Sequence, residues 1–310
     1  MQRRTFLSGA SALTANVLTA GGAWRRALAR TDAECTVTAL TERLFLVRGA
    51  GGNVTVFDSP QGVLMVDGGS PEGSASVLHL VQRRTGKERV EILFNTHWHW
   101  DQTGSNRTLG PAGTRIIAHE NTRLWLGTEI LCKWQHRSFQ PLPPKARPTQ
   151  TFYTSGSLEF GGERIDYGYL PQAHTDGDIY VFFRQANVLV ASDVLAVGHY
   201  PILDYSTNGW IGGMANATQI LADLCTPETR VIPGTGPVQT PSALQAEHEM
   251  LLTLKQRLAK LLAEGMSVED MLAAGPTREF DAQWGDPTLF VSNAWPGLVA
   301  RSRELGVSIV

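Results

Sequence analysis

Residues 92–102 read Ile-Leu-Phe-Asn-Thr-His-Trp-His-Trp-Asp-Gln. The apolar run Ile92–Phe94 predicts a buried strand, and the polar cluster after it lies where α/β proteins place their sites, at the carboxyl end of a strand. His97 and His99 are two residues apart, so in extended backbone their rings point the same way and suit one cation. The sequence therefore predicts a metal site directly after this strand.

The rest of the chain mixes strands and helices around this segment. Short apolar or alternating runs predict strands at 44–47, 54–57, 63–66, 116–117, 158–160, 165–169, 179–183 and 188–190. A helix is expected from Ser70 to Arg84, and leucines at spacings of three and four predict an amphipathic helix from Leu244 to Leu262. The runs 63–67 and 188–193 both end in an aspartate, which suggests two similar β-rich halves.

The composition describes an ordinary globular chain. With 310 residues, 42% of them hydrophobic and 31 glycines, it excludes disordered, collagenous and fibrous proteins. A net charge of −2 without a basic run argues against nucleic acid as a partner. Cys35, Cys132 and Cys225 lack the C-x-x-C spacing, so they encode no thiolate zinc site, and the sequence does not decide whether two of them form a disulfide.

The first 29 residues resemble a twin-arginine export signal. Arg3-Arg4 precede an uncharged stretch rich in Ala, Ser, Thr and Gly, and Ala27-Leu28-Ala29 is a small-residue cleavage site. The stretch is too polar for a stable membrane span, which needs about 20 predominantly apolar residues. We expect residues 1–29 to engage the twin-arginine export machinery. After cleavage near Ala29, residues 30–310, with their helical C-terminal portion, would be periplasmic or secreted; an uncleaved anchor is the alternative.

A third histidine completes a set of metal ligands. His174 lies in Pro171–Asp178, a segment of turn-forming residues that follows a predicted strand. Three neutral imidazoles plus water form a catalytic zinc set, tetrahedral with one open position. Four other histidines show no metal spacing: His79, His119, His136 and His248.

The order of these motifs resembles the metallo-β-lactamase superfamily. Its elements here are His97-x-His99-x-Asp101, the loop histidine His174, Asp193 at the end of a strand pair, and Pro233-Gly234-Thr235-Gly236-Pro237. The resemblance spans roughly residues 44–240. It implies an α/β fold of four layers, an αββα sandwich.

The chain departs from the family where a second metal would bind. Members with two metals have a histidine directly after the motif aspartate and another within Pro-Gly-His-Gly, where this chain has Gln102 and Thr235. Amide and hydroxyl oxygens are poorer zinc donors than imidazole, so only Asp101 and Asp193 remain as strong ligands there. We expect one firmly bound zinc and a second position that is empty or weakly holds a harder ion such as magnesium, calcium or manganese. A retuned substrate pocket is the other explanation.

Three aspartates have expected roles around the zinc. Asp101 orients the attacking water or takes its proton as a general base, in addition to being a candidate ligand. Asp193 is either a further zinc ligand or an acceptor that fixes an imidazole tautomer. Asp67, which matches an early aspartate of the family, is expected to support the ligands from behind.

The substrate side of the site is less defined. His199, beside Tyr200, is a candidate to bind substrate or donate a proton. Gln140–Pro148, with four prolines, cannot form regular structure and is expected to be a surface loop or, with nearby Trp134, a flap over the pocket.

These residues predict an exported zinc-dependent hydrolase. Hydroxide bound to the metal would attack a carbonyl or ester-like centre of a small molecule. The superfamily includes β-lactamases, lactonases, thioesterases, sulfatases and phosphodiesterases, so the resemblance does not select a substrate. One alternative is a mononuclear iron oxygenase acting on persulfides, with His97, His174 and Asp193 as ligands. The other is a non-catalytic metal-binding protein.

Overall fold

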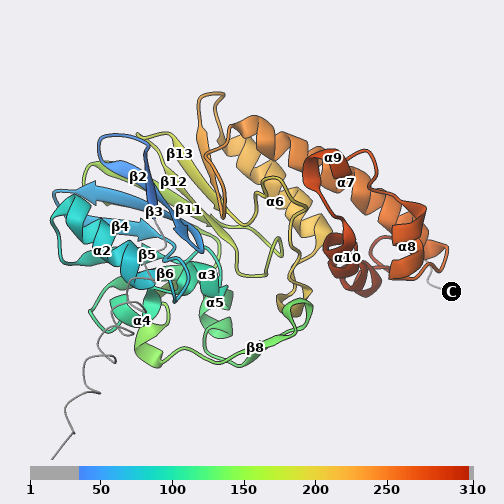
Figure 1. Ribbon diagram of the computed structural model, residues 1–310, viewed down its shortest axis with the longest axis horizontal. Coiled ribbons are helices and arrows are strands. Elements are labelled where there is room, and N and C mark those ends of the chain that lie inside the picture. The colour runs from blue at the N-terminus through green and yellow to red at the C-terminus, as the bar shows by residue number, and fades with distance from the viewer. Residues whose placement is uncertain (1–34, 307–310) are drawn as a thin grey trace, which may run out of the picture.

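The computed structural model describes residues 35–306 (Figure 1). The expected export signal, its cleavage site and the start of the mature chain lie outside these residues. Among the described helices, none combines the length and apolarity that a membrane crossing requires.

The first sheet has seven strands in the order β1-β2-β3-β4-β5-β6-β9. Strands β1 to β4 pair antiparallel, whereas β4, β5, β6 and β9 run parallel. The bounds are β1 Thr36–Ala39, β2 Leu44–Ala50, β3 Gly52–Ser59, β4 Gly62–Val66, β5 Val90–Phe94, β6 Arg115–His119 and β9 Gln150–Phe152.

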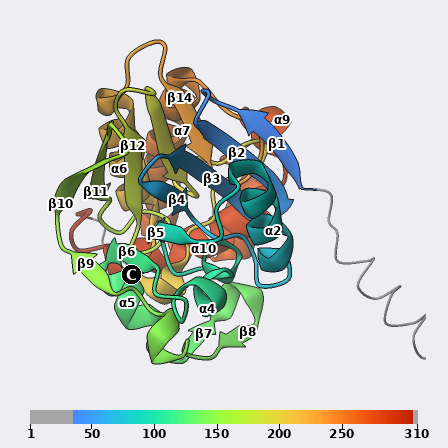
Figure 2. The ribbon, with the colours of Figure 1, turned by 90° about the vertical axis from the view of Figure 1, so that its left-hand side faces the viewer.

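The second sheet has five strands in the order β10-β11-β12-β13-β14. Its bounds are β10 Ser155–Phe160, β11 Glu163–Tyr169, β12 Ile179–Phe183, β13 Val188–Ser192 and β14 Arg230–Pro233. A hairpin at Gly161-Gly162 joins β10 to β11, and both glycines have positive φ. A separate pair, β7 Ile130–Cys132 and β8 Arg137–Phe139, lies at the lower edge of the molecule in Figure 2.

Helices cover both outer faces of the two sheets. They are α2 Ser74–Thr85, α3 Trp100–Thr103, α4 Asn106–Leu109, α5 Glu120–Trp125, α6 Ile211–Leu224, α7 Pro241–Ala263, α8 Val268–Ala274, α9 Asp281–Trp284 and α10 Thr288–Ala300. Three short 3₁₀ turns, η1 Lys133–Gln135, η2 Pro144–Ala146 and η3 Tyr205–Thr207, lie in the loops. The long helix predicted at Leu244–Leu262 is confirmed as α7.

Three apolar cores separate these layers. One fills the space between the sheets, with Leu64 and Phe94 from the first sheet facing Val181 and Val190 from the second. A second core lies between the first sheet and α2, and a third packs α6, α7 and α10 against the second sheet. Figures 1 and 2 show α2 and the α6–α7 pair on opposite sides of the sheets. The predicted αββα sandwich is confirmed.

Two local predictions need correction. The helix expected from Ser70 begins at Ser74, because Ser70 Oγ accepts the N–H of Gly73 at 3.1 Å and holds the intervening residues in a turn. The proline-rich segment Gln140–Pro148 is a loop as expected, except for the single turn η2, which begins at a proline and ends after three residues.

Candidate metal centre

Four potential metal ligands meet at the ends of strands from both sheets. His97 and His99 lie between β5 and α3, His174 follows β11, and Asp193 comes directly after β13. One donor atom from each lies within 4.8 Å of the others, and the three histidines are buried. The fold thus brings together four of the five candidate ligands that the sequence suggested.

Each histidine is held by a partner on the side of its ring that faces away from the cluster. His99 Nε2 is 3.1 Å from Asp204 Oδ2, and His174 Nδ1 is 2.7 Å from the carbonyl oxygen of Ile202. His97 Nδ1 is 3.1 Å from Thr96 Oγ1, whose own hydrogen has acceptors nearby. Because these partners accept hydrogen bonds, the outward nitrogens carry the protons, which leaves lone pairs on the inward nitrogens.

The histidine nitrogens that face the centre of the cluster lie so close together that their lone pairs would repel without a positive charge between them. His99 Nδ1 and His174 Nε2 are 2.9 Å apart, so two lone pairs face each other unless a proton or a metal cation lies between them. His97 Nε2 is 3.3 Å from Asp193 Oδ2 but lacks a hydrogen bond of acceptable geometry to any residue in 35–306. A buried nitrogen without a partner costs free energy, and coordination to a cation would remove that cost. The four residues therefore fit a metal ion.

The electrostatics of the cluster agree with this fit. Burial lowers the pKa of His97 and of His99, which keeps both rings neutral and their lone pairs available. Burial also opposes the charged form of His174, but the carboxylates of Asp193 and Asp178 outweigh it and raise its pKa. Burial alone would raise the pKa of Asp193, yet the contact with His97 and the charge of the nearby His174 hold it well below its usual value. The cluster attracts positive charge.

Asp67 supports the candidate ligands His97 and Asp193 by accepting hydrogen bonds from the residues that precede them, as the sequence suggested. Its carboxyl accepts the backbone N–H of Thr96 at 2.8 Å and the hydroxyl of Ser192 at 3.3 Å. Thr96 precedes His97 and Ser192 precedes Asp193, so one buried side chain fixes the backbone of both. Burial raises the pKa of Asp67 to about 8, against the opposing effect of the hydrogen bonds from Thr96.

Two supporting aspartates were missed by the sequence analysis. Asp204, just before η3, is fully buried, and its contact with His99 outweighs burial and lowers its pKa to about 2. Asp178 accepts the N–H and hydroxyl of Thr175 at 2.7 and 2.9 Å and so fixes the turn that follows His174. Burial raises the pKa of Asp178 to about 7. Both resemble ordinary turn aspartates in sequence, and no spacing distinguishes them.

The position beside the four clustered residues, where a second metal would bind, offers fewer metal-binding side chains. Asp101 is not one of the four clustered ligands; burial and then the charge of Asp193 raise its pKa. Gln102 is fully buried against the backbone of Gly52, where an added Cβ would come within 2.4 Å of its Oε1. Neither amide atom of Gln102 has a hydrogen-bond partner in the part of the chain that the structure describes. Thr235 is exposed.

The loop that carries Thr235 is held close to Asp193. A Cβ on Gly234 would lie 1.6 Å from Asp193 Oδ1, so glycine is required for this approach. The side chain of Asn53 donates to the carbonyls of Pro233 and Gly236 at 2.8 and 3.1 Å, which pins the loop to β3. Sequence reasoning identified the loop but not Asn53.

His199 takes part in none of the hydrogen bonds described above for the metal cluster and its supporting residues. Its ring is exposed, and its Nδ1 is 2.9 Å from the carbonyl oxygen of Tyr200. That hydrogen bond leaves Nε2 as the basic nitrogen of the neutral ring. Trp98, between His97 and His99, is buried and donates to Thr207 Oγ1 at 3.0 Å.

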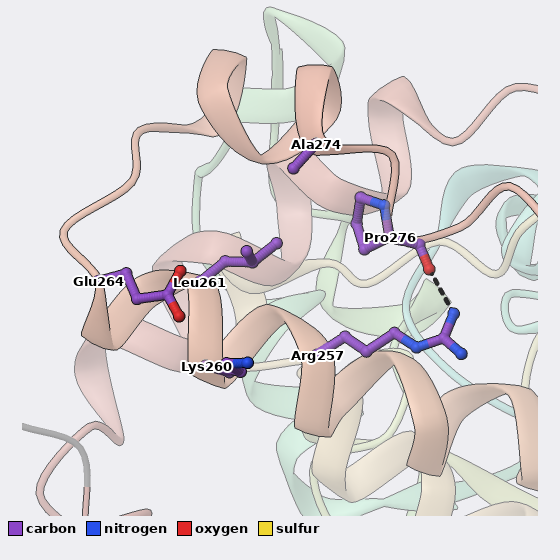
Figure 3. A pocket seen from close by; sticks show the side chains of 6 residues that line it. All are labelled: Arg257, Lys260, Leu261, Glu264, Ala274 and Pro276. Carbon is purple, nitrogen blue, oxygen red and sulfur yellow. Dashed lines mark hydrogen bonds between the residues drawn. The ribbon is translucent and has the colours of Figure 1, made fainter.

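A pocket of about 250 Å³ lies elsewhere, between α7 and the segment after α8 (Figure 3). Its lining consists of Arg257, Lys260, Leu261, Glu264, Ala274 and Pro276. The guanidinium of Arg257 is already bound to the carbonyl of Pro276 at 2.7 Å and to Glu279 at 3.0 Å. The pocket holds no histidine or cysteine and is separate from the metal cluster.

Comparisons with known proteins agree with this architecture. The family model of the metallo-β-lactamase superfamily matches residues 47–257. A metallo-β-lactamase from Pontibacter korlensis matches with a TM-score of 0.58 at 17% identity, covering 71% of this chain and 99% of its own. The DIM-1 metallo-β-lactamase matches with a TM-score of 0.57 at 18% identity, over 71% and 98%.

A longer protein shares more of this chain. The sec-alkylsulfatase Pisa1 from Pseudomonas sp. matches with a TM-score of 0.68 at 15% identity, covering 88% of this chain. This chain spans 51% of the length of that sulfatase. At these identities the structures share the fold, whereas the family model covers more than half of the sequence. The chain belongs to the metallo-β-lactamase superfamily.

Proposed function

We propose that this chain is an exported hydrolase that uses one firmly bound zinc ion to cleave a carbonyl or ester-like small molecule. The observation that carries the proposal is the 2.9 Å approach of His99 Nδ1 to His174 Nε2, with both outward nitrogens hydrogen-bonded to acceptors. Such an approach is stable when a cation is shared between the two lone pairs.

His97, His99 and His174 would hold the zinc, with Asp193 as a fourth ligand. Zn²⁺ held by three imidazoles lowers the pKa of a water ligand to about 7 and so supplies a nucleophile at neutral pH. Zinc suits this set of three imidazoles and one carboxylate, whereas iron would use two histidines and Asp193. No other step of the proposal depends on the identity of the ion.

The chain's own groups handle the protons. Asp101 lies in the first turn of α3, two residues after His99, and burial and then the charge of Asp193 raise its pKa. Its raised pKa, caused first by burial, makes it a better base at neutral pH than an exposed aspartate. We assign it proton removal from the attacking water. His199 is the proposed contact to the substrate: Nε2 of its neutral ring accepts a hydrogen bond, and once it has taken up a proton it can donate that proton to the leaving group.

Gln102 and Thr235 make this a one-zinc site in our proposal. A buried glutamine and an exposed threonine replace the two imidazoles that a second zinc would need, and Asp101 lies outside the four-residue cluster. A harder ion bound weakly beside Asp101 is the remaining role for this position.

Export is a separate part of the proposal and rests on the arginine pair and the Ala-x-Ala segment alone. Replacing Arg3 and Arg4 by lysine should retain the chain in the cytoplasm, whereas the natural sequence should be recovered from the periplasm or medium and begin after Ala29. Cell fractionation followed by N-terminal sequencing measures both. If the natural chain and the lysine variant were divided equally between the cytoplasm and the periplasm or medium, twin-arginine export would be rejected.

The test of the activity joins elemental analysis to a substrate panel. Protein purified without added metal should carry zinc and hydrolyse at least one of an ester, a lactone, a thioester, a β-lactam, a phosphodiester or a secondary alkyl sulfate. The panel includes the β-lactam and the sulfate because structural neighbours are named for them. Iron together with oxygen consumption on a persulfide would favour the oxygenase alternative. Bound zinc without any turnover would favour a non-catalytic metal-binding protein.

A further inference from the structure

A small hairpin reaches the metal centre from outside the two sheets. We call residues 130–139, which comprise β7, η1 and β8, the β7–β8 flap (Figure 2). Two hydrogen bonds dock it on the loop around η3. Trp134 Nε1 donates to Asp204 Oδ1 at 3.0 Å, and the N–H of Lys133 donates to Ser206 Oγ at 3.0 Å.

Asp204 connects this flap to a metal ligand. Its Oδ1 accepts from Trp134 and from the N–H of Ser206 at 3.1 Å, whereas its Oδ2 accepts from His99 Nε2 at 3.1 Å and from Thr207 at 2.6 Å. A carboxylate is planar, so the direction in which Trp134 holds Oδ1 also sets the direction of Oδ2. The Asp204 side chain is fully buried, which strengthens these bonds and limits its alternatives.

His99 transmits that direction to the cluster. Its ring is rigid, with Nε2 on Asp204 and Nδ1 facing His174, so a rotation at one nitrogen displaces the other. The Trp134 ring also lies near it, with ring centroids 6.1 Å apart. Partners behind a metal-bound histidine change metal affinity by about 10–100-fold when they are removed.

We propose that Trp134 is a positioning residue: through Asp204 it aligns His99 for the metal, so that docking of the β7–β8 flap and metal binding stabilise each other. The inference rests on the proposed function only in requiring that the cluster binds a metal. Because coupling between two equilibria is reciprocal, metal binding must also strengthen docking of the flap.

The test is the affinity for Zn²⁺, measured by competition with a chromophoric chelator. Trp134→Phe keeps an aromatic ring but removes the N–H donor, and we expect Zn²⁺ to bind about tenfold more weakly. The matched control is Trp125→Phe, because Trp125 Nε1 donates at 2.6 Å to Asp176, a carboxylate outside the ligand cluster. It should bind Zn²⁺ like the natural chain. Circular dichroism of the metal-free proteins verifies that both variants fold.

Two further readouts separate positioning from a general loss of structure. If Trp134 acts through Asp204, Asp204→Asn combined with Trp134→Phe should bind Zn²⁺ no more weakly than Asp204→Asn alone. Hydrogen exchange of residues 130–139 should slow when Zn²⁺ is added to the natural chain and slow less in Trp134→Phe. The visible spectrum of bound Co²⁺ should differ between Trp134→Phe and the natural chain, because it reports ligand geometry.

The outcomes are distinct. Equal Zn²⁺ affinity of Trp134→Phe and the natural chain would overturn this inference and leave the proposed function intact. Additive losses in the double variant would show that Trp134 does not act through Asp204. A natural chain that binds no Zn²⁺ would overturn both proposals.

Discussion

The metal cluster and the position beside it share the segment after β5 but differ in how their polar atoms are satisfied. Around the cluster, Asp204, Ile202 and Thr96 each hold the outward side of a histidine. Beside it, the amide of Gln102 is buried without a hydrogen-bond partner among residues 35–306. Ligand residues alone do not make a metal site; the partners that fix their orientation are part of it.

The largest effect is expected from removal of a clustered ligand. His97→Ala should reduce bound zinc from one per chain to nearly none and abolish hydrolysis, because it removes one of the three imidazole donors, whose Nε2 lacks a hydrogen-bond partner among residues 35–306. Elemental analysis of the purified variant measures this.

His79, exposed on α2, supplies the control: His79→Ala should keep its zinc and its activity. If His97→Ala kept its full zinc content, His97 would not be a ligand. The metal cluster and the position beside it would then differ less than proposed.

The second prediction separates chemistry from binding. Asp101→Asn should retain the zinc but lower kcat by about 10²–10⁴-fold, the usual contribution of a general base. Steady-state kinetics on the substrate found in the panel, with zinc measured on the same sample, provide the test. A normal kcat would exclude Asp101 as the base, and loss of zinc would identify it as a ligand instead.

The third prediction attempts to turn the neighbouring position into a metal site. Gln102→His together with Thr235→His should raise bound zinc from one toward two per chain, because both imidazoles typical of two-metal relatives are restored. Each single substitution serves as a control and should stay near one. A stoichiometry of one in the double variant would mean that missing orienting partners, and not ligand identity alone, closed the position.

The smallest effect concerns another buried group with an incomplete set of partners. Glu247 on α7 accepts the N–H of Ala196 at 2.9 Å through Oε2, while its Oε1 has no partner among the described residues. Burial raises its pKa well above 4.5. The folded chain therefore binds this proton more tightly than the unfolded chain, and the stability it provides is lost as the pH rises from about 4.5 toward the raised pKa.

Glu247→Gln keeps the acceptor for Ala196 but cannot ionise. Its free energy of unfolding, relative to that of the natural chain, should increase between about pH 5 and about pH 8. Urea denaturation at both pH values measures the difference. A difference independent of pH would mean that the pKa of Glu247 is not raised in the folded chain.

Much of the site was predictable because ligands sit where apolar runs end. Ile92–Phe94 of β5 and the whole of β13 are continuous buried runs, and His97 and Asp193 follow them within a few residues, so the sequence alone indicates a site at the sheet edge. The four layers followed from the motif order through the family resemblance.

The orienting partners were not predictable for a physical reason. Asp204 and His99 are 105 residues apart, and their contact exists only after β5 and the η3 loop have been packed together. Trp134 was expected near the site as part of a flap, but its acceptor depends on the same packing. Local pattern carries no information about such pairs, because each residue has an ordinary role in isolation: a turn aspartate and an aromatic loop residue.

The proposed function requires one metal ion that is bound by three imidazoles. Its direct test is the metal content of the natural chain, purified without added metal and then dialysed against excess Zn²⁺ and back into buffer. The account predicts one zinc ion per chain that resists dialysis. Two tightly held zinc ions would contradict the one-metal site, and none would contradict the metal centre itself.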